Sequence, residues 1–214
     1  MAKNTSGIDL AQLFGAVATN LLSEKDNLNK ADAYNNDHGD NMVQTFETIA
    51  KAVQKKQTGS PAEQLAYAGK SLRSSKSGSA QVYADGLMQA SEQLHGQDII
   101  STENANLMLQ SLLGGGSAPT SNATAGGDLL GSLLGGLTGG DNPQNDDAGL
   151  DMGDLLNAGL AFMNAKQSGS SNMEAAINAL ISASPLGESA HRSQSSAVVA
   201  NTIMQVIGGA ISGK

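Results

Sequence analysis

The residues with the clearest capacity for chemistry lie together in one stretch, residues 27–42, which reads NLNKADAYNNDHGDNM. Amide oxygens, carboxylates and one imidazole are concentrated there, on Asn29, Asp32, Asn35, Asn36, Asp37, His38, Asp40 and Asn41. Amide and carboxylate oxygens are hard ligands that suit Mg²⁺ or Ca²⁺. An EF-hand is excluded because no Glu follows at the spacing that this calcium motif requires. The stretch is therefore a candidate site for a hard metal ion.

A helix is expected to begin where this stretch ends. Met42, Phe46, Ile49 and Val53 recur at three- and four-residue steps, which predicts a helix over residues 41–55. The free amides and the dipole at the start of a helix favour an anion such as a phosphate. Metal ligands beside a helix N-terminus would suit a nucleotide with its Mg²⁺. The alternative is a capped loop in which Asn, Asp and Gly only satisfy turns and the first helical amides.

The rest of the chain predicts an all-α fold. Leu10, Leu13, Phe14, Val17 and Leu21 fall on one helical face. Ser60 followed by a proline is typical of a helix start, here predicted to lead into residues 61–72. Further helices are predicted over residues 81–94, 102–113, 157–164, 173–181 and 196–211. No alternating run of β-branched residues predicts a strand.

Composition narrows the function classes. The 214 residues are expected to form a single domain, 1–214. A net charge of −8 and a pI near 4.7, without a basic patch, argue against a nucleic-acid partner. The absence of cysteine excludes disulfides and thiolate metal sites. No signal-like N-terminus or long apolar run is present, so we expect a cytoplasmic protein without stable membrane insertion.

One segment interrupts the helical pattern. Residues 114–149 are rich in Gly, Ser and Asn and contain the Leu/Gly repeat DLLGSLLGGLTGG. This composition predicts a flexible low-complexity insertion within the domain, since glycine lowers helix stability by up to about 1 kcal/mol at each position. The alternative is an apolar strip that docks on a partner, a lipid or the chain's own helices.

Four blocks together resemble one family. The pattern LN(x5)N-x-D-H-G-x-N-M over residues 28–42 resembles the signature of the nucleotide-binding L subunit of dihydroxyacetone kinases, and that of the N-terminal domain of fatty acid kinases. Three blocks follow in the family's order. SGSAQVYADGL (77–87) is similar to its glycine/serine phosphate loop, DMGDLL (151–156) to T-M-L-D-x-L, and SASPLGESAH (182–191) to R-A-S-Y-L-G-E-R-S-x-G-H.

The resemblance implies an antiparallel helical barrel with ATP or ADP and Mg²⁺ at one rim. The implied metal ligands are Asn29, Asn35 and Asp37. The implied nucleotide-binding residues are His38, Gly39, Asn41, Met42, Ser79, Met152 and Ser184, with Met152 in the base pocket. The family transfers the γ-phosphoryl group to a small substrate held by a partner subunit, so this chain would form half of an active site.

The departures from the family pattern leave three function classes open. Asn35 replaces a carboxylate, so Asp37 is the one charge among the implied ligands, with Asp32 or Asp40 as candidate substitutes. The family's Arg before A-S is Ser182 here, although Arg192 lies ten residues on. The chain could be an active kinase half, a degenerate module that binds a nucleotide or lipid without turnover, or a structural or assembly protein. The sequence does not decide the oligomeric state, the phosphoryl acceptor or the partner.

Overall fold

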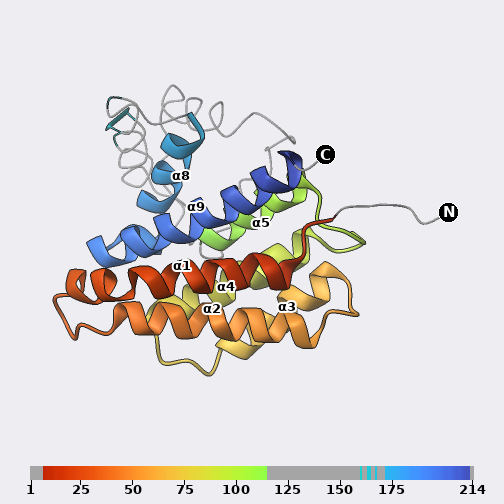
Figure 1. Cartoon of the computed structure of the whole chain (residues 1–214), viewed down its shortest axis with the longest axis horizontal. Helices are drawn as coiled ribbons and strands as arrows, with labels where there is room; N and C mark the ends of the chain where they lie inside the picture. The colour runs from red at the N-terminus through yellow and green to blue at the C-terminus, as the bar shows by residue number, and fades with distance from the viewer. Residues whose placement is uncertain (1–6, 115–159, 161–162, 165–166, 168–171, 213–214) are drawn as a thin grey trace, which may run out of the picture.

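The structure is a computed structural model that describes residues 7–114, 160, 163–164, 167 and 172–212. The described elements are all helical (Figure 1): α1 (Leu10–Ala31), α2 (His38–Lys55), α3 (Pro61–Leu72), α4 (Gly78–Gln93), α5 (Thr102–Gly114), α8 (Asn172–Ser182), the short 3-10 helix η1 (Pro185–Gly187) and α9 (Ala190–Ser212). No strand occurs in these ranges. The predicted all-α fold class is confirmed.

Six helices form a closed ring. Each of α1, α2, α3, α4 and α5 packs on the next, and α9 closes the ring by packing on both α5 and α1. Short connections make consecutive helices antiparallel, and α9 runs antiparallel to α1 beside it (Figure 1). A hydrogen bond from Asn20 Nδ2 to Thr202 Oγ1 (2.9 Å) links the middles of these two helices. The arrangement matches the barrel that the sequence led us to expect.

The interior of the ring is filled by the faces that apolar periodicity predicts. The expected positions on α1 and α2 are all buried: Leu10, Leu13, Phe14, Val17, Leu21, Met42, Phe46, Ile49 and Val53. Phe46 lies at the centre, with its ring centroid 6.3 Å from that of Phe14 and 4.9 Å from that of Tyr83. The edge-to-face contact with Tyr83 joins α2 to α4 across the ring.

Helix boundaries differ from the prediction at both sides of the candidate site. Helix α1 continues through residues 27–31, so the first part of the stretch 27–42 is helical, and the connector between α1 and α2 is residues 32–37. Helix α2 begins at His38 instead of residue 41, because Asn29 Oδ1 on α1 accepts hydrogen bonds from the Gly39 and Asp40 amides in its first turn. Helix α9 begins at Ala190 instead of residue 196, through a polar segment that apolar periodicity could not detect. These extensions bring more polar residues to the helix ends.

The start of α3 follows the predicted capping chemistry. The Ser60 hydroxyl accepts a hydrogen bond from the Glu63 amide (3.3 Å), and the Glu63 carboxylate accepts one from the Ser60 amide (2.8 Å). Pro61 occupies the first turn, where no amide donor is needed. This reciprocal pair fixes where α3 begins.

Some sequence-based predictions lie outside the described residues. These are the insertion beyond residue 114, most of the predicted helix 157–164, and Met152. In the ranges that the structure does describe, no helix has the length and apolar character needed to cross a membrane.

Candidate functional site

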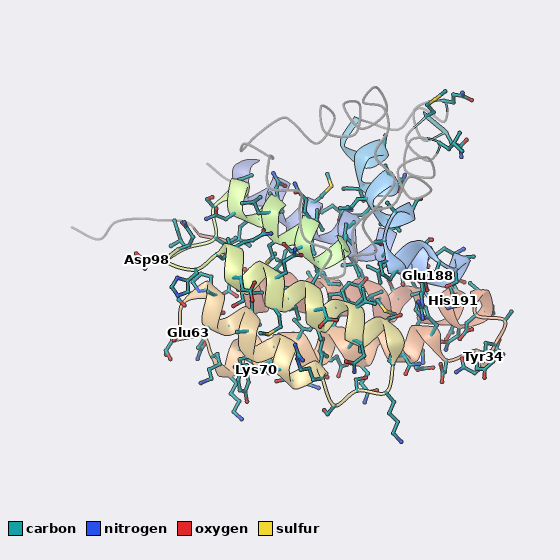
Figure 2. All side chains as sticks on the ribbon, turned by 180° about the vertical axis from the view of Figure 1, so that it is seen from behind. Tyr34, Glu63, Lys70, Asp98, Glu188 and His191 are labelled. Atoms are coloured by element: carbon teal, nitrogen blue, oxygen red, sulfur yellow. The ribbon has the colours of Figure 1, made fainter. Side chains whose placement is uncertain are left out.

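One end of the barrel carries a polar cavity of about 570 Å³. It lies where the end of α1 meets the starts of α2, α4 and α9. Tyr34, Glu188 and His191 gather at this end of the molecule (Figure 2). The lining consists of Asp32, Tyr34, Asn35, Asp37, His38 and Asn41 from the first connector and α2, Lys76, Ser77, Gly78 and Ser79 from the start of α4, and His191 and Arg192 from α9.

Five of the ten site residues that the resemblance implies line this cavity. They are Asn35, Asp37, His38, Asn41 and Ser79. Residues 35–41 are local neighbours, whereas Ser79 lies on α4, so the structure places two blocks that are distant in sequence at one cavity. Asn29, Gly39, Met42 and Ser184 do not line it, and Met152 lies outside the described residues.

Asn29 caps a helix instead of facing the cavity. Its Oδ1 accepts hydrogen bonds from the amides of Gly39 (2.7 Å) and Asp40 (3.3 Å). Its Nδ2 donates to Asp40 Oδ2 (2.8 Å). Because two amides occupy the carbonyl oxygen, the predicted convergence of Asn29 with Asn35 and Asp37 on one metal does not occur in this structure. The capped-loop alternative describes Asn29 well.

Three other residues that were predicted to bind the nucleotide instead support the fold, two by packing and one by capping a helix. Gly39 lies against the backbone of α1, where a Cβ atom would overlap the carbonyl oxygen of Lys25. Met42 is fully buried in the core. The Ser184 hydroxyl donates to the carbonyl of Ile181 (2.9 Å) and accepts from the amide of Leu186 (3.2 Å), which caps η1.

Two carboxylates line the cavity. Asp32 directly follows α1 as its C-cap residue, is only 4% exposed, and accepts a hydrogen bond from the Tyr34 amide (3.0 Å). This bond lowers the pKa of Asp32 below its usual value, with a further contribution from His191, although burial opposes both. Asp37, at the start of α2, accepts from Asn41 Nδ2 (2.6 Å). Asp32 is therefore ionised at neutral pH and faces the same cavity as Asp37.

Asp32 was outside the implied metal set, and the structure separates it from the other candidate substitute. Asp40 is turned toward α1, where it pairs with Lys25 Nζ (3.3 Å) and with Asn29. It does not line the cavity. The chain thus has two carboxylates at the site, Asp32 and Asp37, despite the replacement at Asn35. The presence of Asp32 in the same stretch was the sequence signal for it.

Positive electrostatic potential comes from four sources. The starts of α2 and α4 both open on the cavity with the positive ends of their dipoles. At α2 the amides of Gly39 and Asp40 are already bonded to Asn29, so the amides that can meet a ligand are chiefly those of α4. Lys76 and Arg192 add two formal charges. Ser77 caps α4 with a long hydrogen bond from the Ala80 amide (3.4 Å), and Ser79 lies buried in the first turn. Such a combination can hold a polyanion.

Two histidines of the cavity lining, His38 and His191, contact each other. Their ring centroids are 4.5 Å apart in an edge-to-face contact. His38 is 5% exposed, and its Nε2 lies 2.9 Å from the Ser195 hydroxyl of α9. His191 Nδ1 lies 4.0 Å from Asp32 Oδ1. Burial is the largest cause that lowers the pKa of His38 to about 4, so its ring is neutral at pH 7.

The pKa of His38 predicts a loss of stability in mild acid. The unfolded state takes up a proton on this ring below about pH 6.5, whereas the folded state does so only near pH 4. Stability is therefore complete above pH 6.5 and decreases as the pH falls toward 4. Between pH 7.5 and 5 this group should cost about 2 kcal/mol. Denaturant unfolding at both pH values measures it.

Two variants separate His38 from the other titrating groups. His38→Gln should remove most of this pH dependence, because the glutamine stays neutral throughout. His95→Gln, at an exposed position outside the cavity, should keep the parental dependence. An unchanged slope in His38→Gln would show that His38 is not the source of the pH dependence.

The carboxylates fit a magnesium ion that arrives with its ligand. In the described residues no group of three or more His, Asp or Glu side chains could hold a metal on its own. Mg²⁺ is commonly held by one or two carboxylates, with water and phosphate oxygens filling the remaining positions. Asp32 and Asp37 meet that requirement if a phosphate is present. They do not form a complete protein cage.

Comparison with known families agrees with part of the resemblance. A family model described as DAK2 domain matches residues 35–127, less than half of the chain. This is the family of domains of the dihydroxyacetone kinase L-subunit type, and the matched range contains α2 to α5. The blocks at residues 151–156 and 182–191 lie outside the match. Neither a curated protein nor a solved structure matches the chain significantly.

Proposed function

We propose that this chain binds the phosphates of an adenine nucleotide together with Mg²⁺ in the rim cavity, as the nucleotide half of a two-component kinase. One observation carries the proposal. Two helix starts from separate parts of the chain, α2 and α4, open on one cavity that also holds two carboxylates and two cations. Its volume lies within the roughly 300–1,000 Å³ usual for small-molecule sites.

The two signs of charge suit the two parts of a magnesium–nucleotide complex. The amides at the start of α4, together with the hydroxyl of Ser79, would donate hydrogen bonds to phosphate oxygens from one side. The start of α2, with His38 and Asn41, would approach them from the other. The neutral ring of His38 neither repels the metal nor adds charge to the phosphates.

Asp32 and Asp37 would hold the magnesium ion, which neutralises phosphate charge when it is bound. Asn35, exposed on the same connector, would add an amide oxygen, because among the described residues its Oδ1 accepts only one long hydrogen bond, from the Asp37 amide (3.4 Å). Asn29 has no part in this arrangement, because two amides occupy its carbonyl oxygen. The proposed ligand set therefore differs in one residue from the set that the resemblance implied, because Asp32 takes the place of Asn29.

The proposed reaction transfers the γ-phosphoryl group of ATP to a hydroxyl of a small substrate held by a partner subunit. The bond from the γ-phosphorus to the acceptor oxygen forms, the bond to the β–γ bridging oxygen breaks, and ADP leaves. The hydroxyl proton passes to a base on the partner or to water. The chain's own contribution would be positioning and charge stabilisation, which dominate phosphoryl transfer.

Calorimetric titration with ADP, with and without Mg²⁺, tests the proposal. We expect ADP to bind, more tightly with Mg²⁺, and adenosine to bind much more weakly. Ser79→Ala should weaken ADP binding about 2- to 10-fold, the value of one hydrogen bond. Ser71→Ala, whose hydroxyl bonds within α3, should match the parent. Equal affinity for ADP and adenosine would contradict a phosphate site.

A second candidate is a nucleotide-binding module without turnover. The observation that favours it is the incomplete metal cage, since no group of three acidic or imidazole ligands occurs in the described ranges. Catalysis depends strongly on charge neutralisation around the phosphates. If the chain binds Mg-ADP but transfers no phosphoryl group from ATP with any supplied substrate-binding subunit of this kinase type, the module is the better description.

A further inference from the structure

We infer that Arg192 is the guanidinium that binds the nucleotide's phosphates in this chain. The inference rests on the proposed function and adds a residue to it. Where the related kinases have Arg, Ser182 ends α8 and does not line the cavity. Arg192 reaches the cavity from the first turn of α9.

The guanidinium of Arg192 lies close to other positively charged groups. Arg192 lies in the first turn of α9, and its Nη2 lies close to the start of α4, 3.1 Å from where a Cβ atom on Gly78 would be. Cations are normally disfavoured at helix N-termini. Lys76 lines the same cavity. A cation beside two helix starts, with a second cation on the same cavity, is an arrangement that suits the binding of a polyanion.

The Arg192 guanidinium is held at one terminal nitrogen, Nη1, while the other, Nη2, is available to a ligand. Nη1 donates to Glu188 Oε2 (2.9 Å) and to the carbonyl of Pro185 (3.3 Å). Among the described residues, no hydrogen bond engages Nη2. The Arg192 side chain is 28% exposed and that of Glu188 is 66% exposed. Glu188, the more exposed partner, thus orients the guanidinium, while Nη2 lies beside Gly78 of the cavity lining and can bind a phosphate oxygen without breaking that pair.

The chemistry distinguishes Arg192 from a simple point charge. A planar guanidinium can keep Nη1 on Glu188 and Pro185 while Nη2 donates to a phosphate, whereas an ammonium must make all of its bonds from one nitrogen. Arg192→Lys should therefore restore only part of what Arg192→Ala removes. This order, with Ala weaker than Lys and Lys weaker than the parent, is not expected if Arg192 only caps the loop through Glu188.

Titration of ADP and adenosine into the parent, Arg192→Ala, Arg192→Lys and Arg73→Ala tests the inference. Arg73 is a matched control, because it pairs with Asp85 (3.9 Å) and lies outside the cavity. Arg192→Ala should weaken Mg-ADP binding about 10- to 100-fold, with adenosine binding unchanged. Arg73→Ala should bind ADP as the parent does.

The outcomes separate this inference from the proposed function. A parent that binds no ADP would overturn the proposed function, and the inference with it. A parent that binds ADP, with Arg192→Ala equal to Arg73→Ala, would overturn the assignment of Arg192 alone. Circular dichroism melting of each variant checks folding, and if Arg192→Ala is unfolded, Arg192→Lys must by itself bind ADP more weakly than the parent for the assignment to hold.

Discussion

Replacing Asp32 and Asp37 together with Asn is expected to abolish the Mg²⁺ dependence of ADP binding. These are the two carboxylates that line the cavity. An ionised oxygen that loses its charge while it stays in place weakens its attraction for a dication, and each substitution should cost about 10- to 100-fold. The double variant should bind ADP equally with and without Mg²⁺. Titrations at several Mg²⁺ concentrations measure the dependence.

Asp40 offers the matched control for this experiment. It belongs to the same short segment, but it pairs with Lys25 and Asn29 and does not line the cavity. Asp40→Asn should therefore keep the parental Mg²⁺ dependence. Asn35→Asp should strengthen it, because a third negative ligand would be added on the connector. If Asp40→Asn and the double variant lose the dependence equally, the effect comes from net charge and not from a site.

Much of the fold could be predicted because the core is built from local patterns. The spacing of Leu13, Phe14 and Val17 determines which face of α1 is buried, and no distant residue is needed to read it. The start of α9 could not be predicted in this way. Ser195 and Ser196 are polar, but both are buried, with their hydroxyls 2.9 Å from His38 Nε2 and 3.3 Å from the Tyr83 hydroxyl. Only contacts across the barrel explain a buried polar face.

The candidate site was predictable where its residues are close in sequence. Asn35, Asp37 and His38 follow one another on a connector and a helix start, so a local motif finds them. The choice between Asn29 and Asp32 depends instead on how α1 packs on α2, because that packing turns Asn29 toward the amides of α2. Arg192 enters the cavity only because α9 begins at Ala190. A sequence motif predicts neither the orientation of Asn29 nor the position of Arg192.

The packing of α1 on α2 can also be tested by a substitution at Gly39, where the two helices meet. Gly39→Ala is expected to lower the free energy of unfolding by about 3 kcal/mol, at the upper end of the usual cost of overpacking. The added Cβ atom would overlap the carbonyl oxygen of Lys25, and it would lie 2.9 Å from the carbonyl carbon and 2.8 Å from Asn29 Oδ1. Backbone atoms cannot rotate away as a flexible side chain can, so the helices must separate. Denaturant unfolding without nucleotide measures the change.

Gly15→Ala is the control for Gly39→Ala, because it lies inside α1 with no atom within 4 Å of the added Cβ. It should leave stability unchanged or raise it by up to about 1 kcal/mol, since alanine is the better helix former. The comparison also decides the role of Gly39. A glycine kept for close approach of a phosphate would affect ADP affinity and leave the ligand-free protein stable. A glycine kept for the contact between α1 and α2 must affect stability first, and any weakening of ADP binding would follow from the displaced start of α2. Equal stabilities for the two alanine variants would favour the phosphate role.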